Sequence, residues 1–239
     1  MKTLVNRPYI ICHMMTSLDG KITGPYLNDE HCETIMDLYD KQHEAFVTKA
    51  WICGRKTMEE NFTFGEAPKL ERVETKIPRE DYLVETKHPV YTLSLDPSGK
   101  LGWPANYIEA YNGRSSAHVV EILTESVSDE FLSFLQKMNI SYLFAGKDKI
   151  DLSLLLSKVK NVLKVDTLLL EGGGTLNGTF MKEGFIDELS LMLAPVADGS
   201  TDTPTLFDVG KDTEVMDFTL KSVEKIGTNE LWIRYDVKK

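Results

Sequence analysis

Residues 167–178 decide the fold; they read Thr-Leu-Leu-Leu-Glu-Gly-Gly-Gly-Thr-Leu-Asn-Gly. The leucine run predicts a buried strand at 167–170, and a helix is expected from about Thr175 to Lys182. A glycine-rich junction of this kind lets a ligand reach backbone N–H groups at the positive end of the helix. The stretch therefore predicts an α/β fold and suits a pyrophosphate. A tight turn that needs glycine only for its shape is the alternative.

Two common phosphate-binding motifs are excluded at this junction. No Gly-Lys-Ser or Gly-Lys-Thr follows the glycines, so it is not a P-loop. Asn177 stands where the dinucleotide fingerprint needs its third glycine. Glu171 ends the buried strand, where a carboxylate is costly unless it forms hydrogen bonds. We expect Glu171 either to serve the site or to act as a capping carboxylate.

Hydrophobic periodicity extends this pattern in both directions. Strands are predicted at 9–15, 50–53, 90–95, 118–123 and 141–145, and helices at 33–46, 56–61, 129–138 and 152–163. Residues 62–88 have no clear periodicity and predict a flap or an extended surface loop. The last strands, 189–193, 218–224 and 231–237, end in an antiparallel hairpin. We predict one three-layer αβα domain over residues 1–239, with a mostly parallel central sheet and this C-terminal hairpin.

Composition limits the kind of partner. The chain has 239 residues and a formal charge of -10, which disfavours binding nucleic acid or an anionic membrane through a broad basic face. No apolar run has the length of a membrane helix and the first residues lack a signal-peptide core, so we expect a cytoplasmic protein. The cysteines and histidines show no metal-ligand spacing, and no metal site is expected. Cys12 and Cys53 are predicted to be buried, inert thiols.

Two further segments are candidates for chemistry. Residues 54–57, Gly-Arg-Lys-Thr, lie at a second strand-to-helix junction, where amides, two cations and a hydroxyl can bind phosphate. A solvated surface is the alternative for the cationic pair. Residues 16–22, Thr-Ser-Leu-Asp-Gly-Lys-Ile, follow the first strand at its carboxyl end, where open α/β sheets bind ligands. An Asx-turn explains the Asp19-Gly20 pair equally well.

These three motifs, in this order, resemble the reductase domain of bacterial riboflavin biosynthesis, the RibD C-terminal domain family, which has a dihydrofolate-reductase-like fold. Asp187-Glu188-Leu189 and Ala194-Pro195-Val196 extend the resemblance beyond the glycine run. The resemblance covers essentially the whole chain. It implies an NADPH-dependent reductase, commonly a homodimer, that passes a hydride to the ribosylamino carbon of a pyrimidine ribose phosphate and leaves a ribityl chain.

The resemblance also implies roles for the site residues. The adenosine 2′-phosphate side of NADPH would lie against Gly54, Arg55, Lys56 and Thr57. The pyrophosphate would lie against Gly172, Gly173, Gly174 and Thr175. Asp19 and Glu171 would face the substrate near the nicotinamide, with Ser17 close by. No proton donor is assigned.

The chain departs from the family pattern in one segment. Riboflavin reductases usually follow the second motif with Asp-Asn-Pro and an arginine for the substrate phosphate, whereas residues 59–64 here read Glu-Glu-Asn-Phe-Thr-Phe. Arg72 or Arg79 is expected to replace that arginine. A dihydrofolate or pterin reductase, and a non-catalytic NADPH-binding protein, are the alternative functions. No deaminase segment precedes the motifs, so we expect reduction alone.

Overall fold

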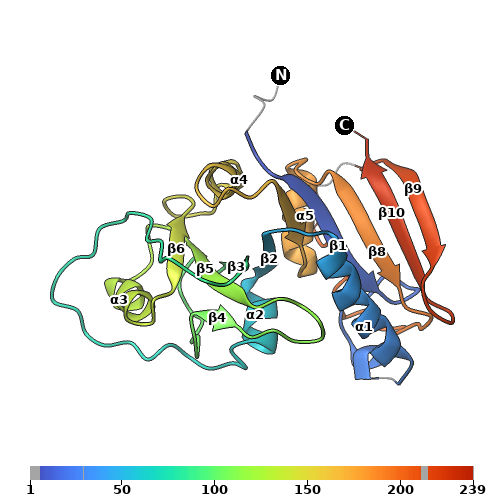
Figure 1. The fold of residues 1–239 in the computed structure, drawn as a ribbon, viewed down its shortest axis with the longest axis horizontal. Coiled ribbons are helices and arrows are strands. Elements are labelled where there is room, and N and C mark those ends of the chain that lie inside the picture. The colour runs from blue at the N-terminus through green and yellow to red at the C-terminus, as the bar shows by residue number, and fades with distance from the viewer. Residues whose placement is uncertain (1–5, 29, 211–214, 239) are drawn as a thin grey trace. The chain divides into compact units, whose positions relative to one another are not determined.

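The computed structural model describes residues 6–28, 30–210 and 215–238. They form two compact units (Figure 1). Unit 1 consists of the described residues before Tyr9 together with 48–111 and 115–166. Unit 2 consists of 9–47, 112–114 and the described residues from 167 onward. Each unit combines a sheet with helices, and each is described separately below.

Five strands form the sheet of unit 2. They are β1 (Tyr9–Thr16), β7 (Thr167–Leu170), β8 (Glu188–Leu193), β9 (Phe218–Lys225) and β10 (Leu231–Val237). Their order is β7-β1-β8-β10-β9. The strand β1 is parallel to both β7 and β8, whereas β10 is antiparallel to β8 and β9. The predicted C-terminal antiparallel hairpin on a parallel sheet is therefore confirmed.

Helix α1 (Glu30–Ala45) covers one face of this sheet, after the short 3-10 helix η1 (Pro25–Asn28). Its residue Ile35 packs with Met192 and Ala194 in a buried cluster. Figure 1 shows α1 in front of β1 and α5 (Gly174–Lys182) behind the strands. In the β1–β8 pairing His13 is opposite Ser190, so both side chains point to the face that α1 covers.

The sheet of unit 1 is also mostly parallel. Its strands are β2 (Ala50–Gly54), β3 (Val90–Leu95), β4 (Tyr107–Ile108), β5 (Ala117–Leu123) and β6 (Ser141–Phe144). Parallel pairs join β2 to β3, β3 to β5 and β5 to β6, and only β4 runs antiparallel to β5. The helices of this unit are α2 (Arg55–Asn61), α3 (Asp129–Lys137) and α4 (Leu152–Asn161). Figure 1 shows α3 and α4 on opposite sides of β6.

The fold class predicted from the sequence is confirmed: the elements alternate as a mostly parallel α/β protein with an antiparallel C-terminal hairpin. Two short elements, η1 and β4, were not predicted, and α1 begins at Glu30 rather than residue 33. Cys12 and Cys53 are buried as expected, and burial raises the pKa of the Cys12 thiol.

The long segment 62–88 is an extended surface excursion anchored on unit 1. Arg79 forms an ion pair with Asp129 and donates to the carbonyl oxygens of Glu125 and Val127. Tyr82 forms an isolated bridge with Tyr142. Because these contacts engage the Arg79 guanidinium, the structure gives no support to its predicted role as a substrate-phosphate ligand.

Two carboxyl groups are fully buried in unit 1. Glu121 in β5 accepts a hydrogen bond from the indole Nε1 of Trp103, and Asp96 accepts one from the backbone N–H of Leu101 at 3.0 Å. Burial, followed by the negative charge of Asp96, raises the pKa of Glu121 well above its usual range. Burial therefore favours the protonated form of Glu121 in the fold, and the stability that this protonation contributes declines as pH rises.

Glu121→Gln should remove this pH dependence, because the carboxamide has nearly the same size and never ionises. The raised folded pKa means that the protonation contributes fully below about pH 4.3 and declines toward higher pH, by up to about 1.4 kcal/mol per pH unit. Urea unfolding from pH 5 to 8 measures this. The free energy of unfolding of the variant should increase relative to that of the wild type as pH rises. If the free energies of the two proteins instead changed in parallel with pH, the raised pKa of Glu121 would be contradicted.

Candidate active site

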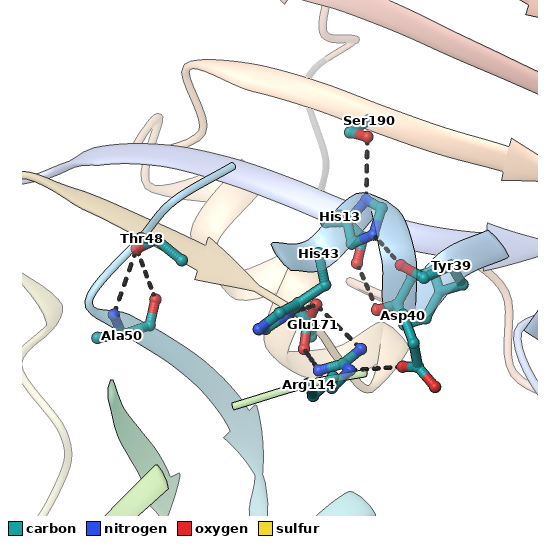
Figure 2. Close-up of polar contacts among 9 residues, drawn as sticks. All are labelled: His13, Tyr39, Asp40, His43, Thr48, Ala50, Arg114, Glu171 and Ser190. Carbon is teal, nitrogen blue, oxygen red and sulfur yellow. Dashed lines mark hydrogen bonds and ion pairs between the residues drawn. The ribbon is translucent and has the colours of Figure 1, made fainter. Parts of the chain in front are cut away.

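In unit 2 the carboxylate of Glu171, directly after β7, lies in a buried ionic cluster (Figure 2). Its Oε1 lies 2.7 Å from Nδ1 of His43, in α1. Its Oε2 accepts a hydrogen bond from Nη1 of Arg114 at 2.8 Å. The side chains of Arg114 and Glu171 are 5% and 3% exposed. The requirement that Glu171 form hydrogen bonds at the end of a buried strand is thus met by one guanidinium and one imidazole.

The same guanidinium also binds a second carboxylate. Arg114 donates from Nε to Asp40 of α1, and Asn112 donates to the other oxygen of Asp40 at 3.0 Å. The guanidinium carbon lies 5.3 Å from the centre of the Tyr39 ring. One buried arginine therefore joins Glu171 to α1 through charge-assisted bonds, which are stronger than neutral ones.

His13 of β1 adds a neutral imidazole to this cluster. Its Nε2 lies 3.3 Å from the carbonyl oxygen of Tyr39, and its Nδ1 lies 3.0 Å from Oγ of Ser190. Since a carbonyl can only accept, Nε2 carries the proton and Nδ1 accepts from the serine. Burial lowers the pKa of His13 to about 4. His13 is consequently uncharged at neutral pH and stacks on the Tyr39 ring at 4.3 Å.

The charge state of Glu171 follows from its partners. Burial by itself would raise the pKa of this carboxyl, but Arg114 and His43 outweigh burial and hold the pKa well below its usual range. Glu171 is an ionised hydrogen-bond acceptor at neutral pH. Since a carboxylate has no proton to donate, Nδ1 of His43 must be the donor in the 2.7 Å bond.

Arg114→Met should destabilise the protein by about 3–5 kcal/mol at pH 7, because it leaves two buried carboxylates without their cation. Arg72→Met is the matched control, since Arg72 is exposed and its loss should cost under about 1 kcal/mol. Denaturant unfolding measures both. The difference should shrink in acid, where protonation can neutralise the carboxylates that the variant leaves without a cation. Equal losses for the two variants would contradict the structural importance of the pair.

Asp19 and Ser17 lie in a separate group within unit 2. Ser17 donates to Asp19 at 2.6 Å, and the backbone N–H groups of Asp198 and Gly199 donate at 3.1 and 2.9 Å. These bonds, that of Ser17 first, hold the pKa of Asp19 well below its usual range. The described hydrogen bonds of Asp19 and those of Glu171 share no residue. The structure therefore brings Ser17 and Asp19 together, as predicted, but does not join Asp19 to Glu171 through a common contact.

In the glycine junction of unit 2, the backbone geometry requires glycine at each of the three positions. Gly172 and Gly173 have φ of 132° and 68°, which L side chains rarely adopt. A Cβ atom on Gly174 would lie 2.3 Å from the carbonyl oxygen of Thr205. The alternative explanation, a turn that needs glycine for its shape, thus accounts for the glycines without a ligand.

The N-terminal cap of α5 nevertheless distinguishes this junction from the starts of α3 and α4. Helices α3 and α4 begin with side-chain caps from Ser128 and Asp151. Gly173 gives α5 no side-chain cap, and the first turn of α5 holds no acidic residue. Its first backbone N–H groups are the kind of donors that bind phosphate at a helix start. An anion near Thr175 would be compatible with this geometry.

The second junction, residues 54–57 in unit 1, is also uncapped. Gly54 begins α2 without a side-chain hydrogen bond. Arg55 pairs with Glu59 at 2.6 Å, and Lys56 with Glu60 at 3.6 Å, each one turn further along the helix. The first pair is partly exposed and the second exposed, so both are weak and can exchange for an anionic ligand. The cations at the helix start thus have acidic neighbours that the sequence interpretation had not assigned to them.

Sequence reasoning missed most of the Glu171 cluster. The sequence shows no metal-ligand spacing for His13 and His43 and gives neither of them a role in the site, and it does not single out Asp40 or Arg114. The one usable signal was Glu171 itself, a carboxylate that closes an apolar strand and needs partners. Within the described residues no group of three or more His, Cys, Asp or Glu side chains is placed to hold a metal ion. None of the described helices is both long and apolar enough to cross a membrane.

Comparison with known families gives a match along almost the whole chain. The sequence model of the RibD C-terminal domain matches residues 8–231. Two relatives carry the name 2,5-diamino-6-ribosylamino-4(3H)-pyrimidinone 5′-phosphate reductase. The one from Methanothermobacter thermautotrophicus is 31% identical over 119 residues, which is 48% of this chain and only 54% of the relative. The one from Archaeoglobus fulgidus is 23% identical over 224 residues, 92% of this chain and 94% of the relative.

Solved structures agree on the fold. A pyrimidine reductase-like protein of Corynebacterium diphtheriae superposes with a TM-score of 0.66 at 14% identity, over 98% of this chain and 94% of that one. RibD of Acinetobacter baumannii gives a TM-score of 0.63 at 21% identity, over 98% of this chain and 58% of that one. At these identities the likeness establishes the architecture and not the activity.

Proposed function

The chain belongs to the RibD C-terminal domain family, and on that premise we propose that it is a reductase of a pyrimidine that carries a ribosylamino phosphate. The observation that carries this proposal is the continuous family match over residues 8–231, together with the shared name of the relatives. That name specifies 2,5-diamino-6-ribosylamino-4(3H)-pyrimidinone 5′-phosphate as their substrate. We take it as the first candidate here, and 5-amino-6-(5-phosphoribosylamino)uracil as the second.

We propose NADPH as the cofactor, which supplies a hydride to the ribosylamino carbon when bound. In unit 2, the uncapped start of α5 supports a role for Gly172, Gly173, Gly174 and Thr175 in holding its pyrophosphate. In unit 1, the uncapped start of α2 and its cations support the assignment of the 2′-phosphate to Gly54, Arg55, Lys56 and Thr57.

The proposed roles of the acidic residues follow from their charge states. Glu171 is ionised, so it can orient a substrate N–H or O–H but cannot donate a proton. Asp19 is also ionised and accepts from Ser17, which makes the pair suitable for orienting polar groups. In this proposal neither carboxylate is the acid of the reaction.

Turnover tests the proposal directly. The purified chain would be mixed with NADPH and each candidate pyrimidine, and NADPH absorbance and the ribityl product would be followed by spectroscopy and mass spectrometry. Dihydrofolate serves as the comparison substrate. We expect reduction of one of the pyrimidines and none of dihydrofolate. Reduction of dihydrofolate alone would replace this function with the alternative, and no reduction of any substrate would contradict it.

Arg55→Ala should weaken NADPH binding about tenfold or more, roughly 1.4 kcal/mol, while NADH binding changes little. The reason is that a charge-assisted pair with a 2′-phosphate is available only to NADPH. Glu59→Gln is the matched control, because it removes the partner of Arg55 and keeps the cation. Calorimetry of both cofactors would show the difference, and equal weakening for NADPH and NADH would exclude this role for Arg55.

The predicted cytoplasmic location and homodimer belong to the same proposal. Both come from the sequence and its resemblance. Sedimentation of the purified chain at several concentrations would give its oligomeric state.

A further inference from the structure

The C-terminal strands of unit 2 present an apolar face that the proposed reaction does not use. On the other face of the sheet, which α1 covers, Trp232 of β10 packs in the cluster of Ile35 and donates to Ser190 at 2.8 Å. Because side chains alternate along a strand, Ile233 and Tyr235 point to the opposite face. The positions paired with them on β8 and β9 are apolar as well.

A β-bulge extends this apolar face onto β9. Val223 is paired with Ile233 and Leu220 with Tyr235, and the register shifts between these two pairs. On a regular strand, two residues three positions apart point to opposite faces, so the bulge is what brings Leu220 and Val223 to the same face. The extra residue is Lys221, which forms an ion pair of 2.6 Å with a buried glutamate on the face of α1.

We call this surface the C-terminal sheet face. Its side chains are apolar, lie at successive positions of three neighbouring strands and are each at least partly exposed: Leu191, Leu193, Phe218, Leu220, Val223, Leu231, Ile233, Tyr235 and Val237. Leu220 and Val223 are 55% and 54% exposed. Figure 1 shows β9 as the outermost strand of this unit. Antiparallel strands usually present polar residues to water, so an apolar face open to solvent indicates a partner.

The size of the C-terminal sheet face suits one side of a stable dimer. The exposed parts of its side chains leave about 400 Å² of apolar surface to solvent, which is within the range of patches that mark interaction sites. A standard interface buries about 800 Å² per partner, and roughly 60% of that area is apolar. The face and its polar rim therefore supply close to the area that association with a second chain needs.

The charges around the face favour a second copy of this chain as the partner. Within the described strands, the one charged side chain at a position of this face is Lys225, at the end of β9, and the exposed Asp217 directly precedes the start of β9. A two-fold axis that lies in the plane of the face and crosses the strands makes the two β9 strands run in opposite directions. Each Lys225 then lies toward the Asp217 end of the other copy. An isologous interface requires this kind of self-complementarity.

We propose that the C-terminal sheet face is the interface of a homodimer, in which two copies pack this face together around that two-fold axis. The proposal rests on the homodimer of the proposed function and names its surface, but it does not depend on the reaction. Face-to-face packing of two sheets with aligned strands is a common arrangement. It removes Leu220 and Val223 from water, which gives the bulge in β9 a purpose.

The test compares the wild type with Leu220→Asp by sedimentation velocity at several concentrations. We expect a dimer of the wild type, and a dissociation constant about 100-fold or more higher in the variant, because each interface would bury two unpaired carboxylates. Leu154→Asp in α4 is the matched control, since Leu154 is 39% exposed and lies outside the face. Circular dichroism should show that both variants keep the fold.

A charge exchange tests the direction of the axis. Lys225→Glu should weaken the dimer about threefold or more, and adding Asp217→Lys to it should restore the affinity. A double variant as weak as Lys225→Glu alone would overturn this axis.

The remaining outcomes are separable. A wild type that is monomeric at every concentration would overturn the interface together with the homodimer. A dimer that Leu220→Asp leaves intact, or that Leu154→Asp weakens equally, would overturn the interface alone. Failure to reduce either pyrimidine would instead overturn the proposed reaction and leave the sedimentation result standing.

Discussion

The ion pair between Arg114 and Glu171 is the interaction on which the candidate site depends. It lies in unit 2, where the guanidinium of Arg114 binds both Glu171 and Asp40. Both carboxylates are almost fully buried. Removing charges from water costs several kcal/mol per ion, so such a pair is favourable only when its geometry and hydrogen bonds are good. Here the bonds meet that condition, and they fix the end of β7, helix α1 and residues 112–114 to one another. The positions of His43 and His13 follow from the same contacts.

The helices of the chain begin in two different ways. The starts of α3 and α4 are closed by Ser128 and Asp151, whose side chains accept from the first turn. The starts of α2 and α5 have glycine caps and no acidic residue in the first turn. A side-chain cap stabilises a helix by about 1 kcal/mol. Helices α2 and α5 lack such a cap and therefore lack this stabilisation. The proposed binding of cofactor phosphate groups at these two helix starts would explain why the side-chain caps are absent.

Much of the fold could be predicted because its signals are local. Apolar runs and helical spacing located the long strands and helices. The turn-forming residues Gly227-Thr228-Asn229, between the last two predicted strands, located the hairpin. The two-residue strand β4 and the single turn η1 are too short to produce periodicity. The site was harder to predict, since Glu171 lies 57 residues from Arg114 and 128 from His43 in sequence. The need of Glu171 for partners was visible in the sequence, but their identity depends on tertiary packing.

The central claim is that the fold keeps Glu171 ionised as a fixed anion, from which the orientation of His43 and the exclusion of Glu171 as an acid follow. The most direct measurement is a pH titration of the ¹³C carboxyl resonance of Glu171, assigned with Glu171→Gln. The account predicts that this resonance stays at its ionised position through the range around pH 4.3 where glutamate ordinarily titrates, until the protein unfolds in acid. A titration at or above that ordinary value would contradict the account.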